Sequence, residues 1–191
     1  MVAIVALMSW LVAVLIVSVV VSVMRGGKLS NLPHIYARAW WLLFVGFGMQ
    51  IVANNVSSSR LAVTLLLTSY VVLLVMVWMN RSAAGMWIAG IGLLMNFTVI
   101  TLNNGMPVLE EAILLAGGSA DSVFGAKHVA LDASSRLPFL ADVIPLPGSV
   151  ISLGDVFLAV GLGAFIEDQL KQPLRLFRHR VQGVPGSAAD R

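Results

Sequence analysis

Two aspartates are the residues best suited to chemistry: Asp142 and Asp155, thirteen positions apart across a proline-rich turn in a very apolar chain. Two carboxylates that face each other in a poorly solvated place cannot both ionise easily, so one pKa rises and the other falls. Such a pair supplies an acid and a base, which can activate water and protonate a leaving group. The pattern permits a hydrolytic dyad, and we expect Asn104 to orient its substrate.

Each aspartate also has a structural interpretation. The run from Ser152 to Asp155 fits a capping box, in which the serine accepts from the backbone and the aspartate reaches back to it. Asp142 can form an ion pair with Arg136, six residues earlier. Both interpretations of each aspartate stay open from sequence alone.

Further polar residues near these aspartates are candidates for binding a ligand. They are Asn96, Asn103, Asn104, His128, Arg136 and Ser152. Asn96 falls within an apolar segment, where an amide needs a partner, so a hydrogen bond between helices is the alternative to a site-lining role. A further helix is predicted over 122–131, and at a spacing of four residues His128 and Asp132 would share one helical face. One histidine with scattered carboxylates is a poor metal signature, and we predict no metal and no other cofactor.

The composition predicts an integral membrane protein. Of its 191 residues, 59% are hydrophobic and 11% are charged, whereas a soluble domain carries about 25% charged residues. The chain has no cysteine, which excludes disulfides and thiolate sites. Its net positive charge does not indicate nucleic-acid binding, because the basic residues flank the apolar segments.

Five apolar segments predict an all-α, polytopic membrane fold with five transmembrane helices. The predicted spans are 2–24, 36–53, 61–79, 83–102 and 150–166. Residues 103–149 form an extracytoplasmic cap between the fourth and fifth spans, with a short helix over 108–116 and a turn at 145–148. We expect one membrane domain over 1–168 and a basic cytoplasmic tail over 169–191, disordered at its end.

The distribution of basic residues predicts the orientation. Three of the twelve Lys and Arg residues fall on the same side as the cap: Arg60, Lys127 and Arg136. The other nine fall on the opposite side: Arg25, Lys28, Arg38, Arg81, Lys171, Arg175, Arg178, Arg180 and Arg191. Cytoplasmic loops carry the excess of positive charge, so we expect an N-terminus outside and a C-terminus inside, in a bacterial plasma membrane.

Several short motifs resemble a family of bacterial multi-span membrane proteins with no assigned function. The matching residues are Asn96, Asn103-Asn104-Gly105-Met106-Pro107, His128, Arg136-Leu137, Asp142-Val143-Ile144-Pro145 and Ser152-Leu153-Gly154-Asp155-Val156. The family tends to have Asn-Gly-Gly where this chain has Asn103-Asn104-Gly105. The resemblance implies a location in the membrane and no particular activity.

A fainter similarity is to lipoprotein signal peptidases, which are four-span membrane aspartyl peptidases. It implies two catalytic aspartates at the outer face, one of them just before the last span, where Asp155 stands. Asp132 or Asp142 would be the other, although neither follows the Gly-Asn of that family.

Taken together, these patterns favour a binding or accessory protein that acts through its cap. The expected partners are membrane lipids and either a membrane-protein complex or a lipid-linked envelope ligand. A membrane-embedded aspartyl hydrolase using Asp142 and Asp155 is the first alternative. A small oligomeric transporter is the second, although spans 2–24 and 61–79 offer almost no polar residues to line a path.

Overall fold

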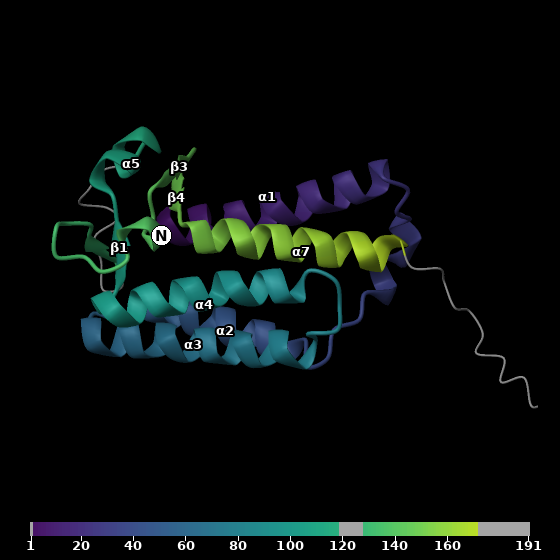
Figure 1. Cartoon of the computed structure of the whole chain (residues 1–191), viewed down its shortest axis with the longest axis horizontal. Coiled ribbons are helices and arrows are strands. Elements are labelled where there is room, and N and C mark those ends of the chain that lie inside the picture. The colour runs from purple at the N-terminus through teal and green to yellow at the C-terminus, as the bar shows by residue number, and fades with distance from the viewer. Residues whose placement is uncertain (1, 119–127, 172–191) are drawn as a thin grey trace, which may run out of the picture.

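The computed structural model describes residues 2–118 and 128–171, and it is mostly helical. Five long helices lie lengthwise beside one another, with short strands and a short helix gathered at one end (Figure 1). The long helices are α1 (Val2–Met24), α2 (Trp41–Asn55), α3 (Ser59–Met79), α4 (Met86–Asn103) and α7 (Leu153–Lys171). They pack in the spatial order α1, α7, α4, α3, α2, so the last helix of the chain lies between the first and the fourth.

Two of these helices are long and apolar enough to cross a membrane, by length and composition. They are α3 and α4, and Val12–Met24 of α1 forms a shorter apolar segment. A helix occurs in each of the five segments predicted as spans. The crossing of a membrane by all five stays a proposal.

The second helix begins later than predicted, at Trp41 and not at residue 36. The Asn80 side chain accepts a hydrogen bond from the Arg38 amide at 2.7 Å and donates one to the Arg38 carbonyl at 2.9 Å. Ala39 then has a left-handed φ of 52°. The contact with Asn80 and this backbone conformation keep residues 36–40 out of the helix.

Glycines bring α4 and α7 into close backbone contact. A Cβ added to Gly92 would lie 2.7 Å from the Leu158 amide nitrogen, and one added to Gly161 would lie 2.7 Å from the Gly85 carbonyl oxygen. Real Cβ atoms do not approach other atoms so closely. The two helices can therefore pack at this distance only with glycine at these positions.

The apolar core lies in two groups, one toward each end of the helices. Toward the cap, Val63, Leu66, Val99 and Ile100 pack with Met106, Leu140 and Ala53. Toward the other end, Met86 of α4 packs with Phe165, Ile166 and Leu170 of α7. The first group includes residues of the cap, so the cap and the helices share one packed core.

The cap is not all helical, which corrects the predicted fold class. Strand β1 (Met106–Val108) pairs in parallel with β2 (His128–Ala130), and Val108 also bridges to Asp142. Strands β3 (Ile144–Leu146) and β4 (Ser149–Ile151) form an antiparallel hairpin. Its turn falls within the predicted 145–148, where Gly148 has a φ of 77°.

The two helices predicted in the cap also need correction. The helix predicted over 108–116 is shorter, since α5 runs from Glu110 to Leu115, and Pro107 and Val108 before it lie in β1. Met106–Val108 forms a strand because its backbone pairs with β2 and with Asp142, which lie about 20 to 35 residues later in the chain. Of the helix predicted over 122–131, residues 128–130 form strand β2 instead. Residues 119–127, and the tail from 172, lie outside the described residues.

Candidate functional site

The candidate site lies where α4 and the start of α7 meet the cap. Four residues form what we call the polar cluster: Tyr70 of α3, Asn96 of α4, and Ser152 and Asp155 at the start of α7. Ser152 is fully buried and Asn96 nearly so. Polar side chains buried among apolar helices require partners, so their hydrogen bonds decide what the cluster does.

The start of α7 is a capping box, as the sequence predicts. The Asp155 amide donates to Ser152 Oγ at 3.1 Å, and the Ser152 amide donates to Asp155 Oδ2 at 2.9 Å. Each residue thereby satisfies a backbone N–H group of the first turn, which has no partner within the helix. A structural role for Asp155 is confirmed by this geometry.

Asn96 joins α4 to this capping box. Its Nδ2 donates to Asp155 Oδ1 at 2.8 Å, and its Oδ1 lies 2.9 Å from Ser152 Oγ. The serine hydroxyl also lies 2.9 Å from Asp155 Oδ2, and it has one proton to donate to one of these two acceptors. The predicted hydrogen bond between helices is confirmed, and both carboxylate oxygens of Asp155 already accept hydrogen bonds.

Tyr70 completes the cluster and was not identified from the sequence. Its phenol interacts electrostatically with the Asn96 side chain and with the Asp155 and Asp142 carboxylates. A tyrosine in the middle of the apolar segment 61–79 was the available signal, because a buried phenol seeks a polar partner. Which partner it finds depends on how three helices pack, and local sequence does not report this.

Asp142 lies in the cap, close to the polar cluster. Its backbone continues the pairing of β1, because its amide donates to the Pro107 carbonyl at 2.9 Å and its carbonyl accepts from the Leu109 amide at 3.0 Å. Its side chain is buried, with 8% of its surface exposed. The structure thus brings both aspartates near Tyr70, one from α7 and one from the cap.

Three of the other predicted binding residues stabilise the connection between α4 and the cap. Asn103 donates to the Arg136 carbonyl at 2.9 Å and accepts from the Arg136 amide at 2.8 Å, so it holds that loop by its backbone. Asn104 is exposed and ends α4 with a left-handed φ of 54°. Asparagine tolerates this conformation better than most residues, so Asn104 has a clear role in the backbone.

His128 and Asp132 do not share a helical face, so that prediction was wrong. His128 lies in β2, and Asp132 lies in an exposed turn where it accepts hydrogen bonds from the Ser134 amide at 2.8 Å and the Ser134 hydroxyl at 2.6 Å. These bonds, with further ones from Ser135, hold the pKa of Asp132 below its ordinary value. Within residues 2–118 and 128–171, no group of three potential metal-ligating side chains comes together.

Comparison with known proteins identifies a family without an assigned activity. No curated protein and no solved structure matches the chain. Residues 34–167 match a family described as "Family of unknown function (DUF5317)". The match begins just before α2, includes every residue of the polar cluster and ends within α7. Because it covers well over half of the sequence, the chain belongs to this family of unknown function.

Proposed function

We propose that this protein is a five-span membrane protein that binds a partner through its extracytoplasmic cap, without catalysing a reaction. Its site would be the outer surface of the cap, and the polar cluster would fix the cap to the helices. The natural partner class is another membrane protein or a lipid-linked envelope molecule at the outer face of a bacterial plasma membrane.

A position in the membrane is supported by large apolar side chains that the helices expose. Exposed examples are Val12, Ile16, Val17, Val20, Phe44, Val45, Ile51, Val52, Leu61, Val71, Val75, Ile88, Ile91, Leu94 and Val160. Patches of this extent are costly in water and normal against lipid. They occur on all five long helices, including α2 and α7.

The proposed orientation follows from the charges at the two ends of the helices. The connections 25–40 and 80–85 and the last turn of α7 lie at the end opposite the cap (Figure 1); we call these segments the basic end. They carry Arg25, Lys28, Arg38, Arg81 and Lys171. Because basic residues are retained on the cytoplasmic side, the cap faces outward and both the basic end and the tail 169–191 face inward.

The observation that carries the binding function is the apolar surface of the cap. Leu114 is 59% exposed, Leu115 is 77% exposed and Phe139 is 63% exposed. The cap nevertheless has a closed interior, since Val108, Ala112, Ile113 and Ala141 are all buried. Large side chains left outside a completed core are available to a partner.

Two variants, each with a single introduced cysteine, test the orientation first. The natural chain has no cysteine, so a single introduced thiol gives an unambiguous label. Ala133→Cys in the cap and Ser82→Cys at the basic end are both exposed positions. A membrane-impermeant maleimide added to intact cells should label the cap cysteine alone; labelling of Ser82→Cys alone would reverse the proposal.

Photo-crosslinking in intact cells then tests the binding function. A photoreactive residue at Leu115 should give a discrete crosslinked product, whereas the same residue at Ile91, exposed in the middle of α4, should give lipid adducts only. The product should disappear when Phe139 or Leu114 is changed to Asp in the same chain. Identical products from Leu115 and Ile91 would contradict a partner-binding cap.

The aspartyl hydrolase remains a second proposal, supported by the proximity of Asp142 and Asp155 to Tyr70. It requires one carboxylate to be available to a water molecule, whereas both oxygens of Asp155 accept hydrogen bonds. Cells carrying Asp142→Asn should accumulate uncleaved envelope lipoprotein if the enzyme proposal holds. Unchanged processing, with an intact helical fold by circular dichroism, would favour the binding function.

A further inference from the structure

Arg81 of the basic end forms an exposed group with Trp78 of α3 and Trp87 of α4, which the proposed function does not use. The Arg81 guanidinium lies over the Trp78 ring, 4.8 Å from its centroid, and its Nη1 donates to the Trp78 carbonyl at 3.1 Å. The Trp87 ring meets Trp78 edge to face, with centroids 6.1 Å apart. Trp78 is 59% exposed and Trp87 is 60% exposed, so the group lies on the surface.

Asn80 brings a second arginine toward this group. Its side chain makes two hydrogen bonds to the Arg38 backbone and a third, at 2.8 Å, to the Met76 carbonyl of α3. Asn80 is itself buried, so this contact is sheltered from water. The backbone of Arg38 is therefore held next to Asn80, the residue before Arg81, and both arginines are exposed.

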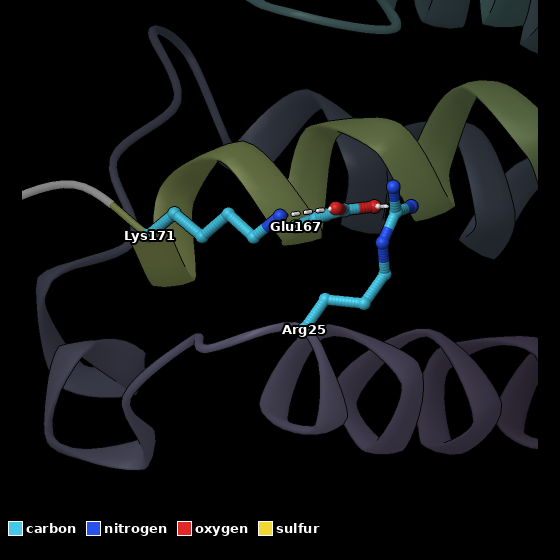
Figure 2. Close-up of polar contacts among 3 residues, drawn as sticks. All are labelled: Arg25, Glu167 and Lys171. Carbon is cyan, nitrogen blue, oxygen red and sulfur yellow. Dashed lines mark hydrogen bonds and ion pairs between the residues drawn. The ribbon is translucent and has the colours of Figure 1, made fainter.

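A different set of charges at the same end is satisfied within the protein. Arg25, which directly follows α1, and Lys171 of α7 both contact Glu167, at 3.0 Å and 2.6 Å (Figure 2). The Arg25 pair joins the end of α1 to α7, whereas the Lys171 pair lies within α7, four residues apart. Arg81 differs from them, because its guanidinium stacks on an aromatic ring and leaves further N–H groups able to donate.

We propose that Trp78, Arg81 and Trp87, with Arg38 beside them, form a binding site for the headgroup of an anionic phospholipid in the inner leaflet. The inference rests on the membrane position and orientation of the proposed function. Tryptophan prefers the level of the headgroups, and guanidinium groups donate paired hydrogen bonds to phosphate. Stacking on Trp78 holds the Arg81 fork in place, which lowers the entropy lost on binding.

The test is native mass spectrometry of the purified full chain in detergent, with phosphatidylglycerol or phosphatidylcholine added. The wild type should retain more phosphatidylglycerol. Arg81→Gln should lower its retention by about fivefold, the factor expected for one basic residue at an anionic surface. Arg60→Gln is the matched control, because Arg60 is exposed at the start of α3, whereas Arg81 follows the end of that helix.

The outcomes separate this site from simpler explanations. Arg81→Lys should recover only part of the binding, because an ammonium group keeps the charge and lacks the planar fork. Equal losses in Arg81→Gln and Arg60→Gln would overturn the site in favour of general charge attraction. Displacement of the lipid by soluble glycerol phosphate would overturn it in favour of a free-phosphate site.

The orientation is tested separately, so the two failures can be told apart. If Ser82→Cys is labelled only from the cytoplasm and Arg81→Gln still binds phosphatidylglycerol as the wild type does, the headgroup site alone is refuted. If Ser82→Cys is labelled from outside, the proposed orientation is refuted, and the inner-leaflet site with it.

Discussion

Replacing Gly92 by alanine should destabilise the packing of α4 against α7. The new Cβ would meet the Leu158 amide nitrogen at 2.7 Å and Phe157 Cβ at 3.1 Å, and it would overlap the Gly154 carbonyl. Backbone atoms cannot rotate away, so the helices must separate, at the upper end of the roughly 1–3 kcal/mol typical of overpacking. The better helix propensity of alanine returns about 1 kcal/mol. A net loss of about 2 kcal/mol should lower the melting temperature by about 4–8 °C for a chain of this size.

Two other glycines make the matched series for this measurement. Gly48 in α2 has nothing within 4 Å of an added Cβ, and Gly90 in α4 would meet only the Val77 Cγ1 atom at 3.2 Å. We expect Gly48→Ala to melt slightly above the wild type, Gly90→Ala near it and Gly92→Ala well below it, as followed by tryptophan fluorescence in detergent. If Gly92→Ala melts at or above the temperature of Gly48→Ala, the close contact between α4 and α7 is refuted.

Three further predictions follow from side-chain contacts. Asn96→Leu should cost about 2 kcal/mol in the same melting assay, because it removes a hydrogen bond to a carboxylate, and an unchanged melting temperature would contradict this. Asn80→Ala should release the backbone at Arg38 and speed its cleavage by trypsin added to inside-out vesicles, while cleavage at Arg60 should not rise. For Asp132 the pKa is lowered on folding, so the carboxylate stabilises its turn above its ordinary pKa and this effect is lost as the pH falls through the lowered pKa. The difference in melting temperature between wild type and Asp132→Ala should therefore shrink on acidification, and growth of the difference would refute the sign.

The helices could be predicted because their signal is local. Continuous apolar segments mark them, and no partner elsewhere in the chain is needed to recognise them. The boundary at 36–40 failed for the opposite reason. The sequence there is compatible with a helix, but Asn80, some forty residues later, holds the backbone in another conformation.

The strands of the cap could not be predicted because their partners are distant and the strands are short. Met106–Val108 pairs with His128–Ala130 and bridges to Asp142, and three residues are too few for an alternating pattern to be visible. Pro107 also favoured the wrong element, since proline is frequent in the first turn of a helix. In β1 its carbonyl accepts from the Asp142 amide, a contact that does not use the N–H that proline lacks.

In the candidate site, too, the local features could be predicted and the contacts between distant residues could not. The capping box at Ser152 and Asp155 spans four residues and was predictable from them alone. For Asn96 the sequence predicts that its buried amide forms a hydrogen bond, but it does not predict which residue is the partner. Tyr70 was missed, since its proximity to the cluster depends on α3, α4 and α7 packing together.

Asp142 and Asp155 look alike in the sequence, but the structure gives them different surroundings. Asp155 begins α7 and is bound to α4 through Asn96. Asp142 belongs to the cap, where its backbone extends the pairing of β1. Both carboxylates act electrostatically on Tyr70 of α3, so the polar cluster lies where three helices meet the cap. Any change that loosens the polar cluster should therefore move the cap relative to the helices. Such a change should therefore lower partner binding more than it lowers helix content. For Asn96→Leu, this result would indicate that the polar cluster positions the cap and is not a catalytic centre.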